Sequence, residues 1–266
     1  MSTCLIIGAK GFIGSAVASE AIARGYTVTA VDLDNYDAVR GSTVDLLINA
    51  AGNARKFIDD QDPIKGYALS VTSVMNALQD FRFSYYVQLS SGAVYPDEGN
   101  PRNNAEDTVL TPEHMSRYGF HKWLAEQLVR HYAPRHLIVR MGGFVGPGLR
   151  KNAVFDLLSG GALFVHPDSE FQYMDTRALA KSVFMLCENS AVESPCLLNL
   201  SAQGTISVRQ IAEWADVALP EEAFRRPRIR AELNVGAAAR LIELPQTRET
   251  VKQFIQSYRN NEVVLG

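Results

Sequence analysis

A glycine-rich segment near the N-terminus limits what this chain can fold into more than any other feature. The apolar run CLII is followed at once by GAKGFIG, which places Gly8, Gly11 and Gly14 at every third position. The apolar spacing around it predicts a strand over residues 3–7 and a helix over residues 11–24. Glycines at such a turn allow a sharp bend, close approach of a pyrophosphate to the backbone, and close helix packing. The segment therefore predicts a dinucleotide-binding loop, with a purely geometric role of the glycines as the alternative.

Short apolar runs alternate with helical stretches along most of the chain. Further strands are expected at 26–31, 44–50, 85–90, 137–141 and 197–200, and helices at 63–80, 112–131 and 176–188. Near-continuous apolar strands separated by helices are typical of a parallel sheet covered on both faces. We therefore expect an α/β fold, a Rossmann doubly wound parallel sheet with a small C-terminal lobe. The expected boundaries are 1–145 and 169–203 for the dinucleotide-binding domain, and 146–168 and 204–266 for the substrate-binding lobe.

The end of the second expected strand carries a residue that can select the cofactor. Asp32 lies eighteen residues after Gly14, in the sequence VTAVDLD. A carboxylate at this position accepts hydrogen bonds from both ribose hydroxyls of NAD, and it repels the 2′-phosphate of NADP. No Arg or Lys follows Asp32 directly, although Lys10 in the glycine-rich loop weakens the preference slightly. NAD is therefore the expected cofactor, and a strand-capping role of Asp32 is the alternative.

Three residues further along the chain have the types needed for acid–base chemistry. Ser91 follows the expected strand 85–90, and Tyr118 and Lys122 stand four positions apart on an expected helix, so they share one face. A lysine ammonium beside a phenol is expected to lower the pKa of the phenol toward neutrality. Tyr118 could then exchange a proton with an alcohol or carbonyl oxygen during hydride transfer to or from nicotinamide, while Ser91 holds that oxygen. YxxxK alone is common by chance, so the prediction depends on the order of all these features.

In this order the motifs resemble those of the extended short-chain dehydrogenase/reductase family, in its NAD-dependent epimerase/dehydratase group acting on nucleotide sugars. The resemblance rests on GAKGFIG, LINAAG, SSGAVYP, YGFHK, IVRMGGFVGPG and FQYMDTRALA. It implies a catalytic set of Ser91, Tyr118 and Lys122. It implies that the dinucleotide is bound by Gly8, Gly11, Phe12, Ile13, Gly14, Asp32, Ala50, Ala51, Gly52, Tyr118 and Lys122. It also implies a homodimer, and substrate contacts from Ser91 and Gly92.

The chain departs from the pattern of this family at three places. Only twelve residues separate Asp32 from Asp45, so the adenine side of the pocket must be trimmed and the sheet could lack a strand. Ser70 stands where many relatives carry an Asn, which speaks against the helix-kinking and water-binding role of that residue. Gly92 and Ala93 follow Ser91, where 4,6-dehydratases carry an Asp-Glu pair. Because elimination of water needs an added acid and base, dehydration is disfavoured, and 4-epimerisation or ketone reduction is left.

Several basic residues are candidates for binding a substrate phosphate. Arg150 and Lys151 follow GPG and could pair with a diphosphate or belong to a solvated loop. The arginines of FRRPRIR could contact a nucleotide phosphate or solvate a turn: Arg225, Arg226, Arg228 and Arg230. The substrate lobe is short, so a large nucleotide would be gripped loosely or the substrate would be smaller. His121, between the two catalytic candidates, is expected to face elsewhere on the helix and to be structural.

The overall composition limits the classes of partner. The net charge of −3 gives no reason to expect nucleic acid or an anionic membrane, and no apolar run is long enough to span a bilayer. The three cysteines lack CxxC spacing, and the five histidines lack ligand spacing, so we expect free thiols in a reducing cytoplasm and no metal.

The sequence thus predicts an NAD-dependent oxidoreductase or epimerase that acts on a secondary alcohol or ketone of a sugar. A nucleotide sugar is the expected substrate, and a 4-epimerase or ketoreductase is favoured over a 4,6-dehydratase. Two alternatives stay open. One is an NAD(P)-binding sensor or scaffold protein of the same fold without turnover, and the other is a reductase of a smaller, non-nucleotide carbonyl compound.

Overall fold

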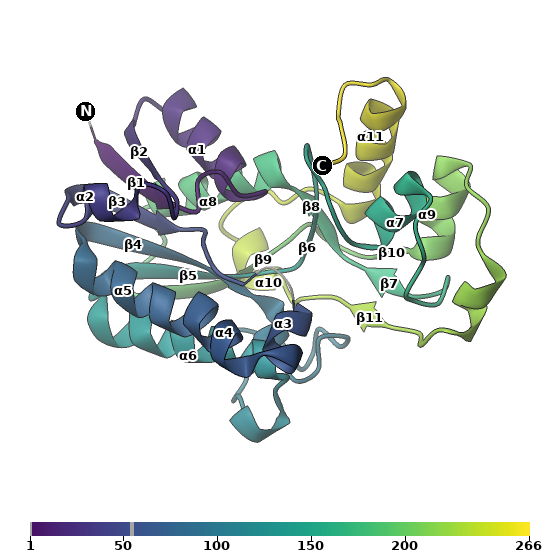
Figure 1. Cartoon of the computed structure of the whole chain (residues 1–266), viewed down its shortest axis with the longest axis horizontal. Helices are drawn as coiled ribbons and strands as arrows, with labels where there is room; N and C mark the ends of the chain where they lie inside the picture. The colour runs from purple at the N-terminus through teal and green to yellow at the C-terminus, as the bar shows by residue number, and fades with distance from the viewer. Residues whose placement is uncertain (1, 54–55) are drawn as a thin grey trace.

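The computed structural model describes residues 2–53 and 56–266, and a six-stranded parallel sheet forms its centre (Figure 1). The strand order is β2-β1-β3-β4-β5-β9. The strands are β1 (Thr3–Ile7), β2 (Thr27–Val31), β3 (Thr43–Asn49), β4 (Arg82–Ser91), β5 (His136–Met141) and β9 (Cys196–Leu200). All six predicted strands therefore pair in one sheet, and the α/β prediction is confirmed.

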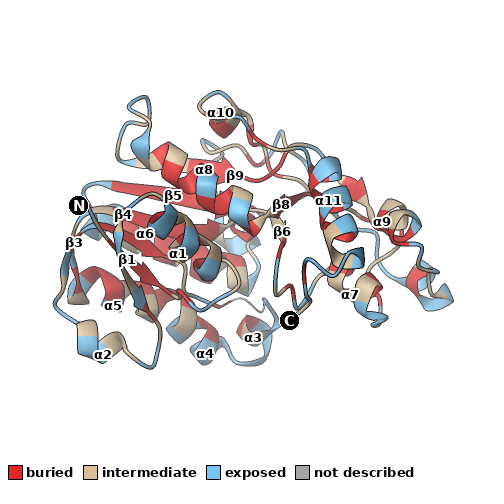
Figure 2. Cartoon of the chain, turned by 90° about the horizontal axis from the view of Figure 1, so that it is seen from above, coloured by how far each residue is buried: buried red, intermediate tan, exposed pale blue. Residues whose placement is uncertain are grey.

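Side chains of the sheet alternate between two apolar cores, because successive residues of a strand point to opposite faces. On β1, Cys4 and Ile6 face one core, whereas Leu5 and Ile7 face the other. The helices α1 (Gly14–Ala23) and α8 (Thr176–Glu188) contribute to the first core, and α5 (Ser73–Asp80) and α6 (Arg117–Tyr132) contribute to the second. Figure 1 shows these two pairs of helices on opposite faces of the sheet, and Figure 2 shows the buried residues concentrated between them.

The segment between β2 and β3 is as short as the spacing of Asp32 and Asp45 predicts. It holds a single short helix, α2 (Tyr36–Val39), and no strand is found there. The edge strand β2 is consequently the last strand on this side of the sheet. The missing strand is a confirmed prediction, since there are too few residues for a second crossover.

The predicted helix over 63–80 is interrupted. It consists of α4 (Pro63–Tyr67), a π-helical segment (Ala68–Thr72) and α5. Ser70 lies within the π-helical segment, and its hydroxyl oxygen is buried without a hydrogen-bond partner among the described residues. Because Ser70 stands where many relatives carry an Asn, we expected no distortion of the helix here. The π-helical segment shows that this expectation was wrong.

The predicted helix over 112–131 is also shorter than expected. A 3₁₀ turn (Pro112–His114) is followed by a break, and α6 begins at Arg117. The hydroxyl of Ser116 accepts a hydrogen bond from the backbone N–H of Gly119 at 3.1 Å, so Ser116 caps the helix. This cap decides where Tyr118 enters the first turn.

A second apolar cluster lies beside the sheet domain and draws on residues 145–173 and 206–263. Its helices are α7 (Ala153–Ser159), α9 (Val208–Ala215) and α11 (Thr247–Arg259), which Figure 1 places together at one end of the molecule. The short strands beside this cluster are β6 (Gly143–Val145), β7 (Glu170–Phe171), β8 (Tyr173–Asp175) and β10 (Ile206–Ser207), and β11 (Arg230–Ala231) pairs with β7. Two short elements complete the fold, α3 (Lys56–Gln61) and α10 (Gly236–Ala239), with 3₁₀ turns at Gly92–Val94 and Glu221–Arg225.

Part of the C-terminal stretch packs on the sheet domain rather than on the second cluster. Leu233, Val235, Ala238, Ile242 and Leu244 all belong to the first core, although they lie within the range 204–266 expected for the substrate lobe. The residue boundaries between the dinucleotide-binding domain and the substrate-binding lobe remain a prediction. Among the described residues no helix has the length and apolar character needed to cross a membrane, and no three His, Cys, Asp or Glu side chains gather as metal ligands.

Candidate active site

The glycine turn after β1 needs glycine at two positions for different reasons. Gly8 has a φ of +80°, and a Cβ there would lie 2.9 Å from the backbone nitrogen of Ala51. A Cβ at Gly14 would lie 1.9 Å from the carbonyl oxygen of Gly8, so no side chain fits where α1 meets the turn. A Cβ at Gly11 would meet only that same carbonyl, at 3.1 Å, and Gly11 is exposed. The turn therefore leaves its backbone open on the outer side at Gly11, as binding of a pyrophosphate requires.

The other predicted cofactor residues gather at the same edge of the sheet. Asp32 follows β2, and its carboxylate accepts a hydrogen bond from the backbone N–H of Lys10 in the glycine turn at 2.8 Å. Ala50, Ala51 and Gly52 follow β3, which pairs with β1. Because the strands are parallel, all of these residues lie at their carboxyl ends, where open α/β sheets bind ligands.

The side chain of Lys10 does not act as a free cation for a 2′-phosphate. Its ammonium pairs with the carboxylate of Asp34, two residues after Asp32. A phosphate beside Asp32 would thus meet two carboxylates and one ammonium that is already paired. The exposed turn at Gly11, the positioned carboxylate of Asp32 and this charge balance fit NAD better than NADP.

Two further predicted cofactor residues, Phe12 and Ile13, connect the turn to both parts of the molecule. Phe12 packs against the second apolar cluster, whereas Ile13 packs against the first core and occupies the N-cap position of α1. The predicted helix therefore begins three residues later than expected, at Gly14, because residues 8–13 form the turn.

Ser91 and Tyr118 lie close together because α6 packs very tightly on the end of β4. A Cβ at Gly119 would lie 2.0 Å from the carbonyl oxygen of Ala93, so only glycine allows this approach. The hydroxyl of Ser91 lies close enough to the phenol of Tyr118 to lower the pKa of that phenol. The Ser91 oxygen also accepts the backbone N–H of Ala93 at 3.2 Å. Gly119 was not singled out from the sequence, since its role depends on a contact with a distant segment.

Lys122 lies one helical turn beyond Tyr118 and faces the same region. Its Nζ is 5.8 Å from the centroid of the Tyr118 ring, and a Cβ at Gly52 would lie 2.9 Å from it. Lys122 is buried, and desolvation lowers the pKa of its ammonium to about 8, although Asp59 and Glu126 act in the opposite direction. The structure thus brings together the ends of β3 and β4 and the first turns of α6, as predicted.

The expectation for the pKa of Tyr118 was wrong for the protein alone. Burial raises the pKa of the phenol to about 12, and the carboxylates of Asp59 and Glu98 act in the same direction. The hydrogen bond from Ser91 lowers this pKa, but it does not outweigh burial. The physical reason is that removal of the phenol from water outweighs every other influence on its pKa, and the Lys122 ammonium, 5.8 Å from the ring centroid, is itself desolvated. Tyr118 is consequently a proton donor at neutral pH.

His121 is turned away from the catalytic candidates, as expected, and belongs to a buried polar cluster. Its Nδ1 lies 2.6 Å from a carboxylate oxygen of Asp59, which is fully buried. The other carboxylate oxygen of Asp59 accepts a hydrogen bond from the side-chain amide of Asn53. A Cβ at Gly66 would lie 2.5 Å from this carboxylate, so α4 also closes over it. The cluster ties α3, α4 and α6 together beneath Lys122.

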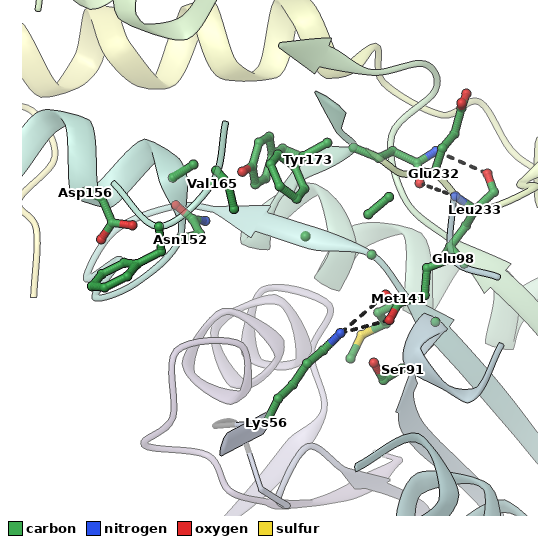
Figure 3. Close-up of a pocket in the computed structure, with 18 residues that line it drawn as sticks. Lys56, Ser91, Glu98, Met141, Asn152, Asp156, Val165, Tyr173, Glu232 and Leu233 are labelled. Carbon is green, nitrogen blue, oxygen red and sulfur yellow. Dashed lines mark hydrogen bonds and ion pairs between the residues drawn. The ribbon is translucent and has the colours of Figure 1, made fainter. Parts of the chain in front are cut away.

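A cavity of about 400 Å³ opens beside Ser91, between the sheet domain and the second apolar cluster (Figure 3). Ser91 and Gly92 are among its lining residues, and their role in binding substrate stays a prediction. Apolar walls come from Met141, Val165, Phe171, Tyr173 and Leu233. This volume falls within the usual range for small-molecule sites.

Several charged residues that line this cavity were not predicted from the sequence. Lys56 on α3 and Glu98 after β4 form an ion pair at 3.0 Å, and Lys56 Nζ also lies 5.8 Å from the centroid of the Tyr118 ring. Asp156 on α7 and Glu232 after β11 complete the charged lining. The rule that function collects after the carboxyl ends of parallel strands could have indicated Lys56 and Glu98, since they follow β3 and β4. No comparable signal exists for Asp156.

The predicted phosphate-binding residues do not belong to this lining. Arg150 and Lys151 are both exposed, and neither is among the residues that line the cavity. Arg150 lies against the C-terminal Gly266, where a Cβ would come 2.7 Å from its Nε. Of the arginines in FRRPRIR, Arg230 pairs with Glu170 and Glu232, and Arg226 lies over the ring of Phe164.

A parallel sheet with a glycine turn after its first strand, an acidic second strand end and a Ser–Tyr–Lys set define a Rossmann-type dehydrogenase of the short-chain class. The model of the NAD dependent epimerase/dehydratase family matches residues 4–159. This range is more than half of the chain, and the chain belongs to this family. It is therefore an NAD-dependent enzyme by family, and NAD is the cofactor that its glycine turn and Asp32 fit. No curated protein matches the sequence.

Solved structures of similar fold cover nearly the whole chain. A structure of MoeE5 in complex with UDP-glucose and NAD has a TM-score of 0.79 and 19% identity, and covers 98% of this chain and 99% of that chain. A UDP-galactose 4-epimerase has a TM-score of 0.75 and 20% identity, with coverage of 97% and 99%. A dTDP-4-dehydrorhamnose reductase from Bacillus anthracis, in complex with NADP, has a TM-score of 0.76 and 16% identity, with coverage of 96% and 98%. At these identities the likeness establishes the fold.

Proposed function

We propose that this protein oxidises, reduces or epimerises a secondary alcohol or ketone of a sugar with NAD as cofactor. The observation that carries the proposal is the gathering of three side chains. Ser91 lines a cavity and interacts with the phenol of Tyr118, and the buried Lys122 has its Nζ 5.8 Å from the centroid of the Tyr118 ring. Two hydroxyls that meet where the first turn of α6 packs on the end of β4 form a site for one substrate oxygen.

Each member of the set has a separate task in the proposed reaction. NAD, when bound, accepts a hydride from the carbinol carbon or returns one to the carbonyl carbon. The Tyr118 oxygen exchanges a proton with the substrate oxygen, and the Ser91 hydroxyl holds that oxygen by a hydrogen bond. The Lys122 ammonium lies against Gly52 at the end of β3, where it would bind the nicotinamide ribose and stabilise negative charge on Tyr118.

The pKa of Tyr118 bears on the direction of proton transfer. A phenol with a pKa of about 12 keeps its proton at neutral pH, so it is ready to donate that proton to a carbonyl oxygen. Reduction of a ketone therefore requires no prior change in the protein. Removal of a proton from an alcohol requires the pKa of Tyr118 to fall when positive charge comes close. Both half-reactions occur in an epimerase, and only one occurs in a reductase.

Dehydration has no support in this site. Gly92 is buried and carries no acid, and a Cβ there would lie 2.6 Å from the side chain of Leu233, which would have to move to admit a larger residue. The next residue, Ala93, is buried and apolar. We therefore favour 4-epimerisation or ketone reduction over 4,6-dehydration. The similar solved structures include a UDP-galactose 4-epimerase, a dTDP-4-dehydrorhamnose reductase and a complex with UDP-glucose, which supports a sugar substrate and makes nucleotide sugars the first compounds to test.

The test is Tyr118→Phe, assayed beside the unmodified protein with NAD or NADH on a set of nucleotide sugars and free sugars. Turnover should fall by about two to four orders of magnitude, the usual contribution of general acid–base catalysis, while the Kd for NAD changes little. Trp123→Phe, on the same helix, is the matched control and should keep its turnover. Equal activity of Tyr118→Phe and unmodified protein would remove Tyr118 from the mechanism. NAD binding without turnover on any compound would favour the sensor alternative.

A further inference from the structure

The polar side chains that line the cavity are nearly all occupied by bonds within the protein. Asn152 uses its side-chain oxygen to cap α7 and its amide to reach the carbonyl of Phe144. Gln172 exchanges two hydrogen bonds with the backbone of Leu233, at 3.0 Å and 3.3 Å. These groups shape the cavity, but they are not free to recognise a ligand.

The charged side chains of the lining are paired with one exception. Lys56 pairs with Glu98, and Glu232 pairs with Arg230 at 2.5 Å. Asp156 is partly buried on α7 and has no ion-pair partner among the described residues. Desolvation raises the pKa of its carboxyl group, and no other group acts on this pKa. Asp156 thus bears a cost of burial that no contact offsets in the part of the chain that the structure describes, residues 2–53 and 56–266.

Asp156 and the catalytic hydroxyls occupy different ends of the cavity. In Figure 3 the Asp156 carboxylate lies at one end of the lining residues, and Ser91 lies at the other with the Lys56–Glu98 pair. A substrate whose reacting oxygen binds at Ser91 would therefore place its far end near Asp156. An ionised carboxylate only accepts hydrogen bonds, so that end must supply donors.

The charge balance of the lining disfavours a phosphorylated substrate in this cavity. Among the described residues the lining holds three carboxylates, from Glu98, Asp156 and Glu232, and a single ammonium, from Lys56. Within the lining that the structure describes, a diphosphate would come close to the unpaired Asp156, or it would have to break the Lys56–Glu98 pair to obtain a cation. Like charges in a partly desolvated site repel each other strongly.

We propose that Asp156 is the substrate-recognition residue of this cavity, and that it binds a hydroxyl or ammonium group of a sugar that carries no phosphate there. This inference rests on the proposed function, since it takes the reacting oxygen to lie at Ser91. It favours a smaller, non-nucleotide substrate over the nucleotide sugar that the sequence led us to expect. Hydroxyl and ammonium donors share this chemistry, and the binding experiment separates them.

The contact between Arg226 and Phe164 suggests the opposite possibility, a substrate that carries a nucleotide. The Arg226 guanidinium lies 5.8 Å from the ring centroid of Phe164, and Phe164 both lines the cavity and is 64% exposed. A nucleotide that extended out of the cavity could therefore meet Arg226 at its mouth. Binding of that kind would depend on Arg226 and would not depend on Asp156.

The test measures binding by titration calorimetry to the NADH-saturated protein and to its Asp156→Asn and Arg226→Ala variants. The probes are D-glucose, D-glucosamine, glucose 1-phosphate and UDP-glucose. We expect at least one of the two unphosphorylated sugars to bind about tenfold more tightly than either phosphorylated compound, and Asp156→Asn to weaken it about tenfold. A stronger effect on D-glucosamine than on D-glucose would identify the ammonium as the donor. Glu249→Gln removes one exposed charge from α11, away from the cavity lining, and should change neither affinity.

Tighter binding of UDP-glucose, weakened by Arg226→Ala and unchanged by Asp156→Asn, would overturn the inference. Failure of both unphosphorylated sugars to bind would overturn it as well. These results are distinct from a failure of the proposed function, which would show as loss of NADH binding or as unchanged turnover in Tyr118→Phe. Turnover of UDP-glucose that depends on Tyr118 would leave the proposed function intact while rejecting the role of Asp156.

Discussion

Glu126 and Arg140 form a buried ion pair directly behind the catalytic helix. The guanidinium of Arg140 donates to both carboxylate oxygens of Glu126, at 2.7–3.2 Å, and the side chains are 3% and 0% exposed. Glu126 lies one helical turn after Lys122 and also accepts the hydroxyl of Ser90 at 2.6 Å. The pair therefore fixes α6 against β4 and β5, and with it the positions of Tyr118 and Lys122.

Removal of one partner of this pair should destabilise the protein strongly. Glu126→Gln leaves the Arg140 charge buried without compensation, which costs about 3–5 kcal/mol of unfolding free energy. The exposed pair of Arg177 and Asp175 supplies the control, because Arg177→Ala should cost less than about 1 kcal/mol. Urea denaturation of both variants measures the difference. Equal small losses would show that the buried pair does not hold the helix.

Lys122 should be required for turnover, although its buried charge lowers the unfolding free energy of the protein. Because burial lowers its pKa to about 8 from 10.5, the folded state releases this proton more readily than the unfolded state. The unfolding free energy should therefore rise with pH between about 8 and 10.5. Lys122→Met should be more stable than the unmodified protein at pH 7, by on the order of 1–3 kcal/mol, and should lose turnover.

Measuring the unfolding free energies of Lys122→Met and the unmodified protein at two pH values tests whether the buried charge is the cause of the difference. The stability gap between Lys122→Met and the unmodified protein should narrow from pH 7 to pH 9.5, as measured by urea denaturation. Lys181→Met, on the exposed side of α8, should show almost no gap at either pH. A gap for Lys122→Met that does not change with pH would mean that packing, and not the buried charge, is responsible.

Asp32 should determine both the affinity and the choice of cofactor. Asp32→Ala removes a carboxylate that Lys10 holds at the glycine turn, so the Kd for NAD should rise about 10- to 100-fold. The preference for NAD over NADP should narrow, because the repulsion of a 2′-phosphate is reduced. Calorimetric titration with both cofactors measures this, with the exposed Asp37→Ala as control. Tighter binding of NADP than NAD to the unmodified protein would refute the role given to β2.

Gly14 should tolerate no side chain. In Gly14→Ala the new Cβ would overlap the carbonyl oxygen of Gly8, so α1 must shift away from the turn. We expect a loss of about 1–3 kcal/mol in unfolding free energy, together with weaker NAD binding. Ser15→Ala, at the neighbouring exposed position, should affect neither quantity appreciably. Unchanged stability in Gly14→Ala would show that the turn can relax at little cost.

Local sequence patterns predicted those features of the site that depend on residues close together in the chain. The spacing of Gly8, Gly11 and Gly14 predicted a turn whose geometry leaves no space for a side chain at Gly14. The short interval from Asp32 to Asp45 predicted the missing strand. The four-residue spacing of Tyr118 and Lys122 placed them on one face, because helix periodicity is a local property.

Features that depend on contacts between distant segments could not be predicted from local sequence patterns. The π-helical segment at Ser70 and the need for glycine at Gly119 depend on what packs against these residues. The pKa of Tyr118 was predicted in the wrong direction, because a motif shows which charges accompany a group but not how far that group is removed from water.

The amino-acid sequence by itself determined the class of this protein, since apolar periodicity, a glycine turn and an ordered set of reactive residues are all local in the chain. Only the tertiary structure decided what the active site offers a substrate. Lys56, Glu98 and Asp156 come from three separate elements, and it is their meeting around one cavity, with Asp156 left unpaired, that sets its charge. Charge balance in a cavity depends on distances and burial across the whole fold, and no spacing along the chain encodes them.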